Sequence, residues 1–180
     1  MNKTQRKILN AAFEVLAQDF SAPLEKVAES AGITRATLHR YYSNREALME
    51  ATGLELFRLT QEIIEDALAN HDEPLEQLKA VVMKSAENGD RFHFLMHAME
   101  HDDHEQHYPK FQESEQSMIN LIEAVRQDGL IRSDMPTAWV IHVYYGIMSA
   151  SWGALNKGSV APNRIPELVW QSFISGVFAE

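Results

Sequence analysis

The chain has 180 residues, 45% of them hydrophobic, which is enough to bury the core of one domain or of a small domain joined to a larger one. Its 16 Lys and Arg residues stand against 26 Asp and Glu residues, and the net charge of −10 excludes a basic nucleic-acid coat protein. The absence of cysteine excludes a disulfide scaffold, thiolate zinc sites and cysteine nucleophiles. The N-terminal residues contain no apolar signal-peptide core, which predicts a cytoplasmic protein.

The charge is distributed unevenly along the chain. Residues 1–50 contain seven basic and six acidic residues, whereas residues 51–180 contain nine basic and 20 acidic residues. The first segment is therefore nearly neutral and the second is strongly acidic. This difference indicates two parts with different partners, of which only the first can approach a polyanion without strong repulsion.

Apolar residues recur at helical spacing almost throughout the chain, and no segment alternates with the period of two that is typical of a strand. The pattern therefore predicts an all-α fold of about nine helices. The expected helices lie over residues 3–18, between Pro23 and Gly32, from Thr34 to about Tyr42, over residues 45–70, 75–88, 91–104 and 109–127, after Ser133–Pro136, and from the 158–166 loop to the C-terminus.

Residues 138–155 are apolar around nearly the whole circumference of the expected helix, and the last helix is similarly apolar. A membrane span needs about 20 such residues, and this run is slightly short and contains His142. A soluble helix of this kind must be covered on both sides. We therefore predict a self-association surface built from these two helices, with plain core or a membrane span as the alternatives.

Residues 24–42 place two short helices on either side of a glycine-centred turn, which is the spacing of a helix-turn-helix. Ala28 is small where the two helices cross, and Gly32 supplies the positive φ that the turn needs. Polar side chains of the second helix then point outward, where they can hydrogen-bond base edges and phosphates in a major groove. An ordinary helical hairpin with a solvated polar face is the alternative.

Residues 1–50 resemble the DNA-binding domain of the TetR (tetracycline-repressor) family of transcriptional regulators. The matching stretches are Ile8–Phe13 on the first helix, Val27–Thr34 across the turn, and Thr37–Leu48 with its aromatic pair. The resemblance implies a helix-turn-helix DNA-binding domain over residues 1–46. It also implies a helical ligand-binding and dimerisation domain over residues 47–180.

The resemblance assigns DNA contacts position by position. Arg45 stands where the family usually has a lysine, at the start of the fourth helix beside a backbone phosphate. The other residues at base-reading or phosphate-contacting positions are Thr34, Arg35, Ala36, Thr37, Arg40 and Tyr41.

Two positions depart from the family pattern. His39 occupies a position where the family usually has tyrosine, and a protonated His39 would make DNA binding depend on pH. The family often has a threonine near the start of the second helix, where this chain has Ala22–Leu24. That phosphate contact is therefore lost or moves to Ser21.

For the acidic body, the resemblance implies a homodimer formed through the last two helices, with the two recognition helices about 34–36 Å apart on a palindromic operator. A small-molecule effector would favour a geometry with the wrong half-site spacing and so release the repressor. No other cofactor is expected to be required. Each candidate pocket residue has the alternative of being an ordinary core or dimer contact. The candidates are Phe92, Phe94, Met96, Met99, Met118, Trp139, Tyr144, Met148 and Trp152.

A histidine stripe, defined as His93, His97, His101 and His104, has the spacing of one face of a helix. Imidazoles one turn apart can chelate zinc, nickel or copper, and neighbouring carboxylates can complete the shell. A divalent metal, and with it a metal-responsive regulator, is therefore one hypothesis. A solvated polar stripe and adventitious metal binding are the alternatives.

No nucleophile elbow, phosphate-binding loop or acid–base carboxylate pair is found in the sequence, so we do not expect an enzyme. Hydrolytic zinc chemistry at the histidine stripe is the one candidate for an enzymatic activity. The remaining alternative is a helical interaction protein or co-regulator with weak DNA binding. The salt dependence of DNA binding separates this co-regulator from a DNA-binding regulator, because affinity that depends on phosphate contacts falls steeply with salt.

Overall fold

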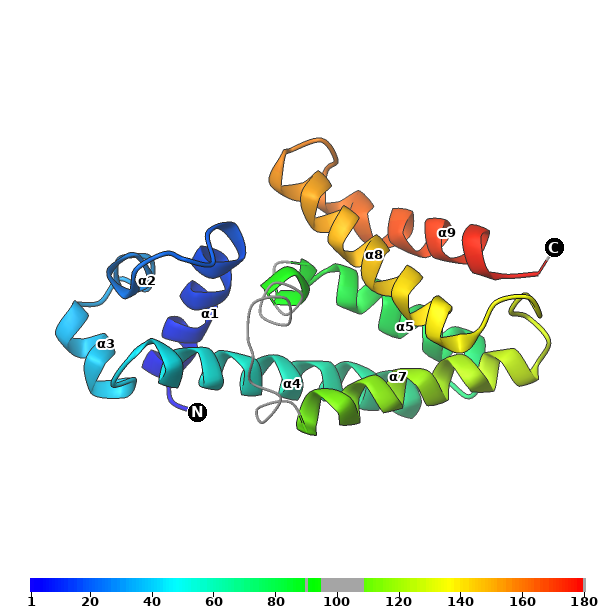
Figure 1. Ribbon diagram of the computed structural model, residues 1–180, viewed down its shortest axis with the longest axis horizontal. Coiled ribbons are helices and arrows are strands. Elements are labelled where there is room, and N and C mark those ends of the chain that lie inside the picture. The colour runs from blue at the N-terminus through cyan, green and yellow to red at the C-terminus, as the bar shows by residue number, and fades with distance from the viewer. Residues whose placement is uncertain (90, 95–108, 180) are drawn as a thin grey trace. The chain divides into compact units, whose positions relative to one another are not determined.

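The computed structural model describes residues 1–89, 91–94 and 109–179. Over these ranges the regular structure is helical, apart from one isolated bridge between Ile131 and Phe178 (Figure 1). The prediction of an all-α fold is therefore confirmed. None of the helices in the described ranges is both long and apolar enough to cross a membrane. The chain forms two compact units, the first containing residues 1–58 and 91–94 and the second containing residues 59–89 and 109–179.

The first unit contains three helices and the start of a fourth. Local signals define their ends: the Asn2 side chain accepts the N–H groups of Thr4 and Gln5, and the Gln5 side chain accepts the Asn2 N–H in return, so the first turn is capped from both sides. Thr34 caps the third helix in a similar way. The helices are α1 (Lys3–Gln18), α2 (Leu24–Ser30), α3 (Arg35–Tyr41) and the first part of α4 (Arg45–Asn70).

The core of the first unit is apolar and drawn from all four helices. Helix α2 packs against α1 and α3, and each of the four helices contributes at least one buried side chain. Phe13 and Phe94 meet edge to face with ring centroids 5.6 Å apart, which brings the 91–94 segment into this core. The buried residues include Ile8, Leu9, Ala12, Phe13, Leu16, Val27, Ala28, Leu38, Leu48, Leu56 and Phe94.

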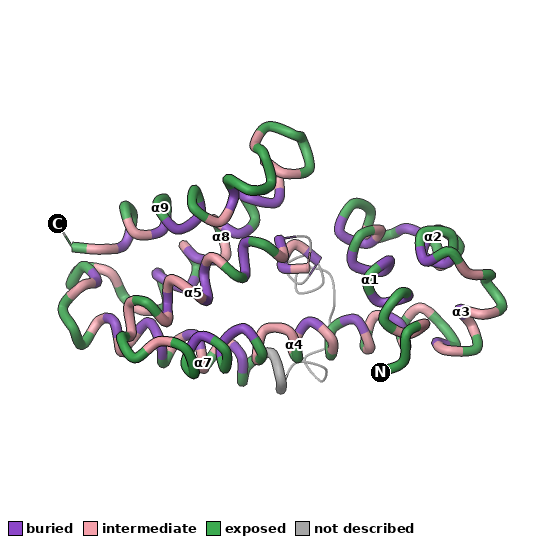
Figure 2. The backbone as a smooth tube through the Cα atoms, turned by 180° about the vertical axis from the view of Figure 1, so that it is seen from behind, coloured by how far each residue is buried: buried purple, intermediate pink, exposed green. Residues whose placement is uncertain are grey.

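The second unit is a helical bundle in which α5 contacts α7, α8 and α9, and α8 contacts both α7 and α9. Figure 2 shows buried residues along α5 and along one side of α8 and of α9, as expected for a shared apolar core. Trp170 and Phe173 of α9 and Tyr144 of α8 belong to this core. The helices are α5 (Pro74–Ala86), α7 (Pro109–Gln127), α8 (Thr137–Asn156), a short 3-10 turn (Pro162–Arg164) and α9 (Ile165–Val177).

The observed helix ends follow the sequence signals closely, with one difference of physical interest. The last helix was expected to reach the C-terminus, but α9 ends at Val177. The chain leaves the helix there because the Val177 carbonyl accepts the Arg132 N–H at 3.0 Å and the Ala179 N–H donates to the Leu130 carbonyl at 2.9 Å. Of the helix expected over 91–104, residues 91–94 are helical and the rest lie outside the described residues.

Candidate nucleic-acid interface

The turn between α2 and α3 has the geometry that a helix-turn-helix requires. Gly32 adopts a φ of 64°, a left-handed conformation that side chains with a Cβ rarely adopt. The Gly32 N–H donates to the Glu29 carbonyl at 3.0 Å, and the Ile33 N–H donates to the Ala28 carbonyl at 2.9 Å. These bonds satisfy carbonyl groups at the end of α2 and fix the direction in which α3 begins.

Helix α3 begins at a threonine pair. The Thr34 hydroxyl accepts the Thr37 N–H at 3.1 Å and lies 3.0 Å from the Thr37 hydroxyl. This N-cap satisfies one of the N–H groups that a helix leaves unpaired in its first turn. Thr34 and Ala36 are exposed, and Thr37 is half-buried. The predicted base-reading positions are thus at the start of a short, capped helix.

Arg35 and His39 lie one turn apart on α3 and contact each other. The Arg35 Nε donates to His39 Nε2 at 3.3 Å, and His39 Nδ1 lies 3.2 Å from the Ser43 carbonyl. Because arginine only donates and a carbonyl only accepts, these contacts fit a neutral His39 with its proton on Nδ1. Arg35 also forms an ion pair with Glu25 of α2 at 2.5 Å. The exposed guanidinium is therefore held between two helices.

The end of α3 carries a cation and an aromatic pair. Arg40 is exposed, and its guanidinium lies 5.7 Å from the ring centroid of the half-buried Tyr41. Tyr42 points inward, where burial raises the pKa of its hydroxyl above the ordinary value and the nearby Glu55 charge adds to the effect. The two tyrosines therefore differ in role, because only Tyr41 has surface available to a partner.

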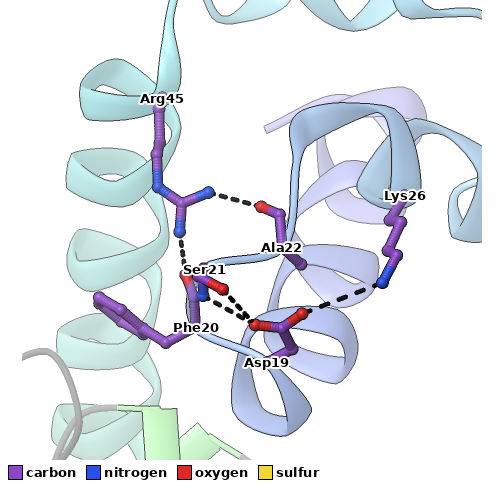
Figure 3. A network of polar contacts seen from close by, with 6 residues as sticks. All are labelled: Asp19, Phe20, Ser21, Ala22, Lys26 and Arg45. Carbon is purple, nitrogen blue, oxygen red and sulfur yellow. Dashed lines mark hydrogen bonds and ion pairs between the residues drawn. The ribbon is translucent and has the colours of Figure 1, made fainter.

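Ser21 and Arg45, two further predicted phosphate contacts, both bond to the loop between α1 and α2 (Figure 3). The Ser21 hydroxyl donates to the Asp19 carboxylate at 2.6 Å, and this bond is the main cause of the lowered pKa of Asp19. The Arg45 guanidinium donates to the Ala22 carbonyl at 2.6 Å and to the Phe20 carbonyl. Both side chains thus act within the loop.

The first unit contains two further residues that bear on the site and were not predicted. Asp19 closes the loop by accepting both the N–H and the hydroxyl of Ser21, and the Asp-Phe-Ser spacing of such an Asx turn is visible in the sequence. Glu25 orients Arg35, but this pairing joins two helices across the turn and has no signature of its own.

The predicted pocket residues fall in different places. Phe92 and Phe94 are buried in the first unit. Met118, Tyr144 and Met148 belong to one apolar cluster of the second unit. Trp152 is buried on the same helix as Tyr144 and Met148, whereas the side chain of Trp139 is 56% exposed. Met96 and Met99 lie outside the described residues.

The interior of the second unit also contains polar contacts. The Tyr144 hydroxyl hydrogen-bonds Ser85 of α5, and burial raises the pKa of that hydroxyl far above its ordinary value. Ser114 of α7 is also buried, and its hydroxyl accepts a hydrogen bond from the Gln61 amide at 3.1 Å. The interior of the second unit thus contains neutral hydrogen-bonding groups as well as its apolar cluster.

Of the histidine stripe, His93 lies within the described residues. His93 is half-buried in the first unit. His97, His101 and His104 lie outside the described residues. Within residues 1–89, 91–94 and 109–179, no three His, Asp or Glu side chains gather closely enough to hold a metal ion.

Comparison with known proteins gives a consistent picture. The family of bacterial regulatory proteins described as tetR matches residues 8–52, which contain the helix-turn-helix. The HTH-type transcriptional repressor LfrR of Mycolicibacterium smegmatis is 26% identical over 175 residues, covering 97% of this chain and 90% of that protein. The HTH-type transcriptional regulator NfxB of Pseudomonas aeruginosa is 24% identical over 165 residues, covering 86% of this chain and 84% of that protein.

A solved structure supports the same fold over the whole length. The crystal structure of the TetR-like regulator LfrR from Mycobacterium smegmatis in complex with proflavine has a TM-score of 0.78 and 25% sequence identity to this chain. The match covers 98% of this chain and 97% of that one. The similarity therefore includes the helical body as well as the N-terminal helices.

Proposed function

Because the chain belongs to the TetR family of transcriptional regulators, we propose that it is a repressor that binds a palindromic operator as a homodimer and releases it when a small-molecule effector binds the body. The observation that carries the proposal is the surface of α3. Its first turn exposes Thr34, Arg35 and Ala36, and its last turn exposes Arg40. Short polar groups followed by cations suit base edges and flanking phosphates in a major groove.

The charge distribution supports DNA binding through the first 50 residues of the chain. Residues 51–180 have 20 acidic and nine basic residues, so a duplex is repelled from the body and tolerated only by the nearly neutral first 50 residues. With few cations to neutralise phosphates, we expect a shallower salt dependence than that of a basic DNA-binding protein. Specific contacts from α3 then have to supply more of the affinity.

Dimerisation through α8 and α9 is supported by the surfaces that these helices leave uncovered. Helix α8 buries Tyr144 and Met148 on one side, and on the other it exposes Trp139, Gly146 and Ala150. A large exposed aromatic next to small residues one turn apart is typical of a surface that another helix covers. On α9, Leu168 is similarly exposed at 37%.

The dimer proposal has a test that leaves the monomer fold intact. A Cβ built at Gly146 meets no described atom within 4 Å, and the same is true of Gly53 on α4. A Gly146→Leu substitution should therefore fold but block close approach of a second α8, whereas Gly53→Leu is the matched control. Sedimentation equilibrium should show a weakened dimer for the first variant only. If Gly146→Leu leaves the dimer unchanged, the dimer interface does not include this part of α8.

The effector proposal starts from the relative whose structure contains proflavine, a planar aromatic cation. In this chain the second unit is acidic, its core cluster contains Tyr144 and Met148, and the Tyr144 hydroxyl hydrogen-bonds Ser85. Aromatic rings, polarizable sulfur and hydrogen-bonding groups suit a planar cation. Planar aromatic cations are therefore the first effectors to test, with a neutral planar compound of similar size as the control.

The DNA-binding proposal is tested by paired substitutions of exposed arginines. Arg40→Ala removes a cation of α3, and Arg164→Ala removes an exposed cation of the second unit, so the two variants have the same net charge. On a duplex enriched from a random pool, Arg40→Ala should lower the affinity and reduce the slope of log K against log salt by about 0.9. Equal behaviour of both variants would contradict a contact from α3.

A further inference from the structure

The loop that joins α1 to α2 is tied together by its own side chains (Figure 3). After α1 ends, the Ala22 N–H donates to the Asp19 carbonyl at 2.9 Å. The Asp19 carboxylate accepts the Ser21 N–H at 3.1 Å and the Ser21 hydroxyl at 2.6 Å, and it lies 3.9 Å from the Lys26 Nζ. The loop is therefore closed on one side, and the carbonyls of Phe20 and Ala22 point away from this network.

Arg45, the first residue of α4, donates to both of these carbonyls. One terminal nitrogen of its guanidinium donates to the Ala22 carbonyl at 2.6 Å, and the other donates to the Phe20 carbonyl. The guanidinium also lies 5.9 Å from the centroid of the Phe20 ring. Its side chain is partly buried in these contacts. One planar cation thus holds two carbonyls and a ring of the same loop.

The other face of the loop is also supported. Phe20 lies beside Phe94, with ring centroids 5.9 Å apart, and Ala22 is 1% exposed. Helix α2 starts two residues after Ala22, and its Glu25 forms the ion pair with Arg35 of α3. The loop held by Arg45 therefore determines where α2 begins and, through Glu25, bears on a side chain of the recognition helix.

We propose that Arg45 is a positioning residue that fixes the loop before α2 and so orients the helix-turn-helix, and that it does not bind a DNA phosphate. The inference rests on the proposed DNA-binding function. Its physical basis is that each terminal nitrogen of the guanidinium already donates to a backbone carbonyl of the loop, so a phosphate that drew the side chain outward would have to break these two bonds. Lysine cannot replace this arrangement, because its single nitrogen offers neither the planar fork nor the same stacking.

The two roles of Arg45 predict different results for Arg45→Lys. If the residue binds a phosphate, lysine keeps the charge and the affinity stays within about twofold of the parent. If it positions the loop, Arg45→Lys and Arg45→Ala both lose about tenfold or more in DNA affinity, which is the loss of roughly one or two charge-assisted hydrogen bonds. Arg40→Ala is the matched control, because it removes an exposed cation of α3.

Salt titration and hydrogen exchange together make the test decisive. For a positioning residue, Arg45→Ala keeps the parent slope of log K against log salt, whereas Arg40→Ala reduces it by about 0.9. In the protein without DNA, the amides from Ser21 to Val27 should exchange about tenfold faster or more in both Arg45 variants and stay unchanged in Arg40→Ala. Far-UV circular dichroism verifies that each variant is folded. If Arg45→Ala does not fold, the hydrogen-exchange comparison is made with Arg45→Lys alone.

Several outcomes overturn the proposal. Each of three results would show that Arg45 contacts a phosphate or has only a surface role. These results are rescue of the affinity by lysine, a reduced salt slope for Arg45→Ala, and unchanged hydrogen exchange in the loop. If the parent protein enriches no DNA, the repressor proposal fails while hydrogen exchange still decides whether Arg45 holds the loop. The two failures are therefore distinguishable.

Discussion

A pair of glycine-to-alanine substitutions tests whether the turn of the helix-turn-helix depends on a left-handed residue. Gly32 has a φ of 64°, and an added Cβ would meet no described atom within 4 Å, so the cost of Gly32→Ala is conformational and not steric. An L residue in this conformation costs about 1–2 kcal/mol, and the stiffer unfolded chain returns about 0.4–1 kcal/mol. We expect a net loss of about 0.8 kcal/mol in the free energy of unfolding, the difference between the midpoints of these two ranges.

Gly53 provides the control with the opposite sign. It lies inside α4, also with no described atom within 4 Å of an added Cβ. Alanine is preferred there, so Gly53→Ala should raise the free energy of unfolding by about 0.5–1 kcal/mol. Urea unfolding at one protein concentration measures both changes, and each 1 kcal/mol corresponds to about 2–4 °C in Tm for a chain of this size. A Gly32→Ala protein as stable as the parent would refute the reasoning.

Two further predictions concern the cores of the two units. Phe94→Ala should lower the free energy of unfolding by about 3–5 kcal/mol, since the ring is 1% exposed and packs edge to face on Phe13; a loss below about 1 kcal/mol in urea titration would contradict that packing. Burial raises the pKa of Tyr144, so above about pH 10 the unfolded chain loses a proton that the folded chain keeps, and stability falls as pH rises. Urea titrations at about pH 9 and about pH 11 should show a smaller fall in Tyr144→Phe than in the parent, and equal falls would exclude this tyrosine as a cause.

The local features of the first unit could be predicted because their causes are local. Gly32 ends α2 and Thr34 caps α3 through bonds that span three to five residues, and a sequence pattern reports such causes directly. The start of α4 at Arg45 and its end at Asn70 follow in the same way from the breaks at Ser43-Asn44 and at residues 71–74. The residue types of the interface were thus accessible from the sequence.

The bonding of individual side chains was less accessible, because it depends on partners far along the chain. Arg45 reaches carbonyls 23 and 25 residues earlier, and sequence position alone gave it the phosphate contact usual for its family. Phe94 packs on Phe13, so its aromatic character could not distinguish a pocket wall from the core of the first unit. The end of α9 at Val177 depends on pairing with residues 130–132. Each of these requires tertiary contacts that no local pattern encodes.

Selection of bound duplexes from a random DNA pool at near-physiological salt tests whether this protein reads a palindromic operator through α3. We predict an enriched palindrome whose half-site centres are about 34–36 Å apart or a multiple of that spacing. Loss of enrichment in Arg40→Ala but not in Arg164→Ala would assign the selection to α3. A folded, dimeric protein that enriches no sequence, alone or after addition of divalent metal, would contradict the repressor and favour a co-regulator with weak DNA binding.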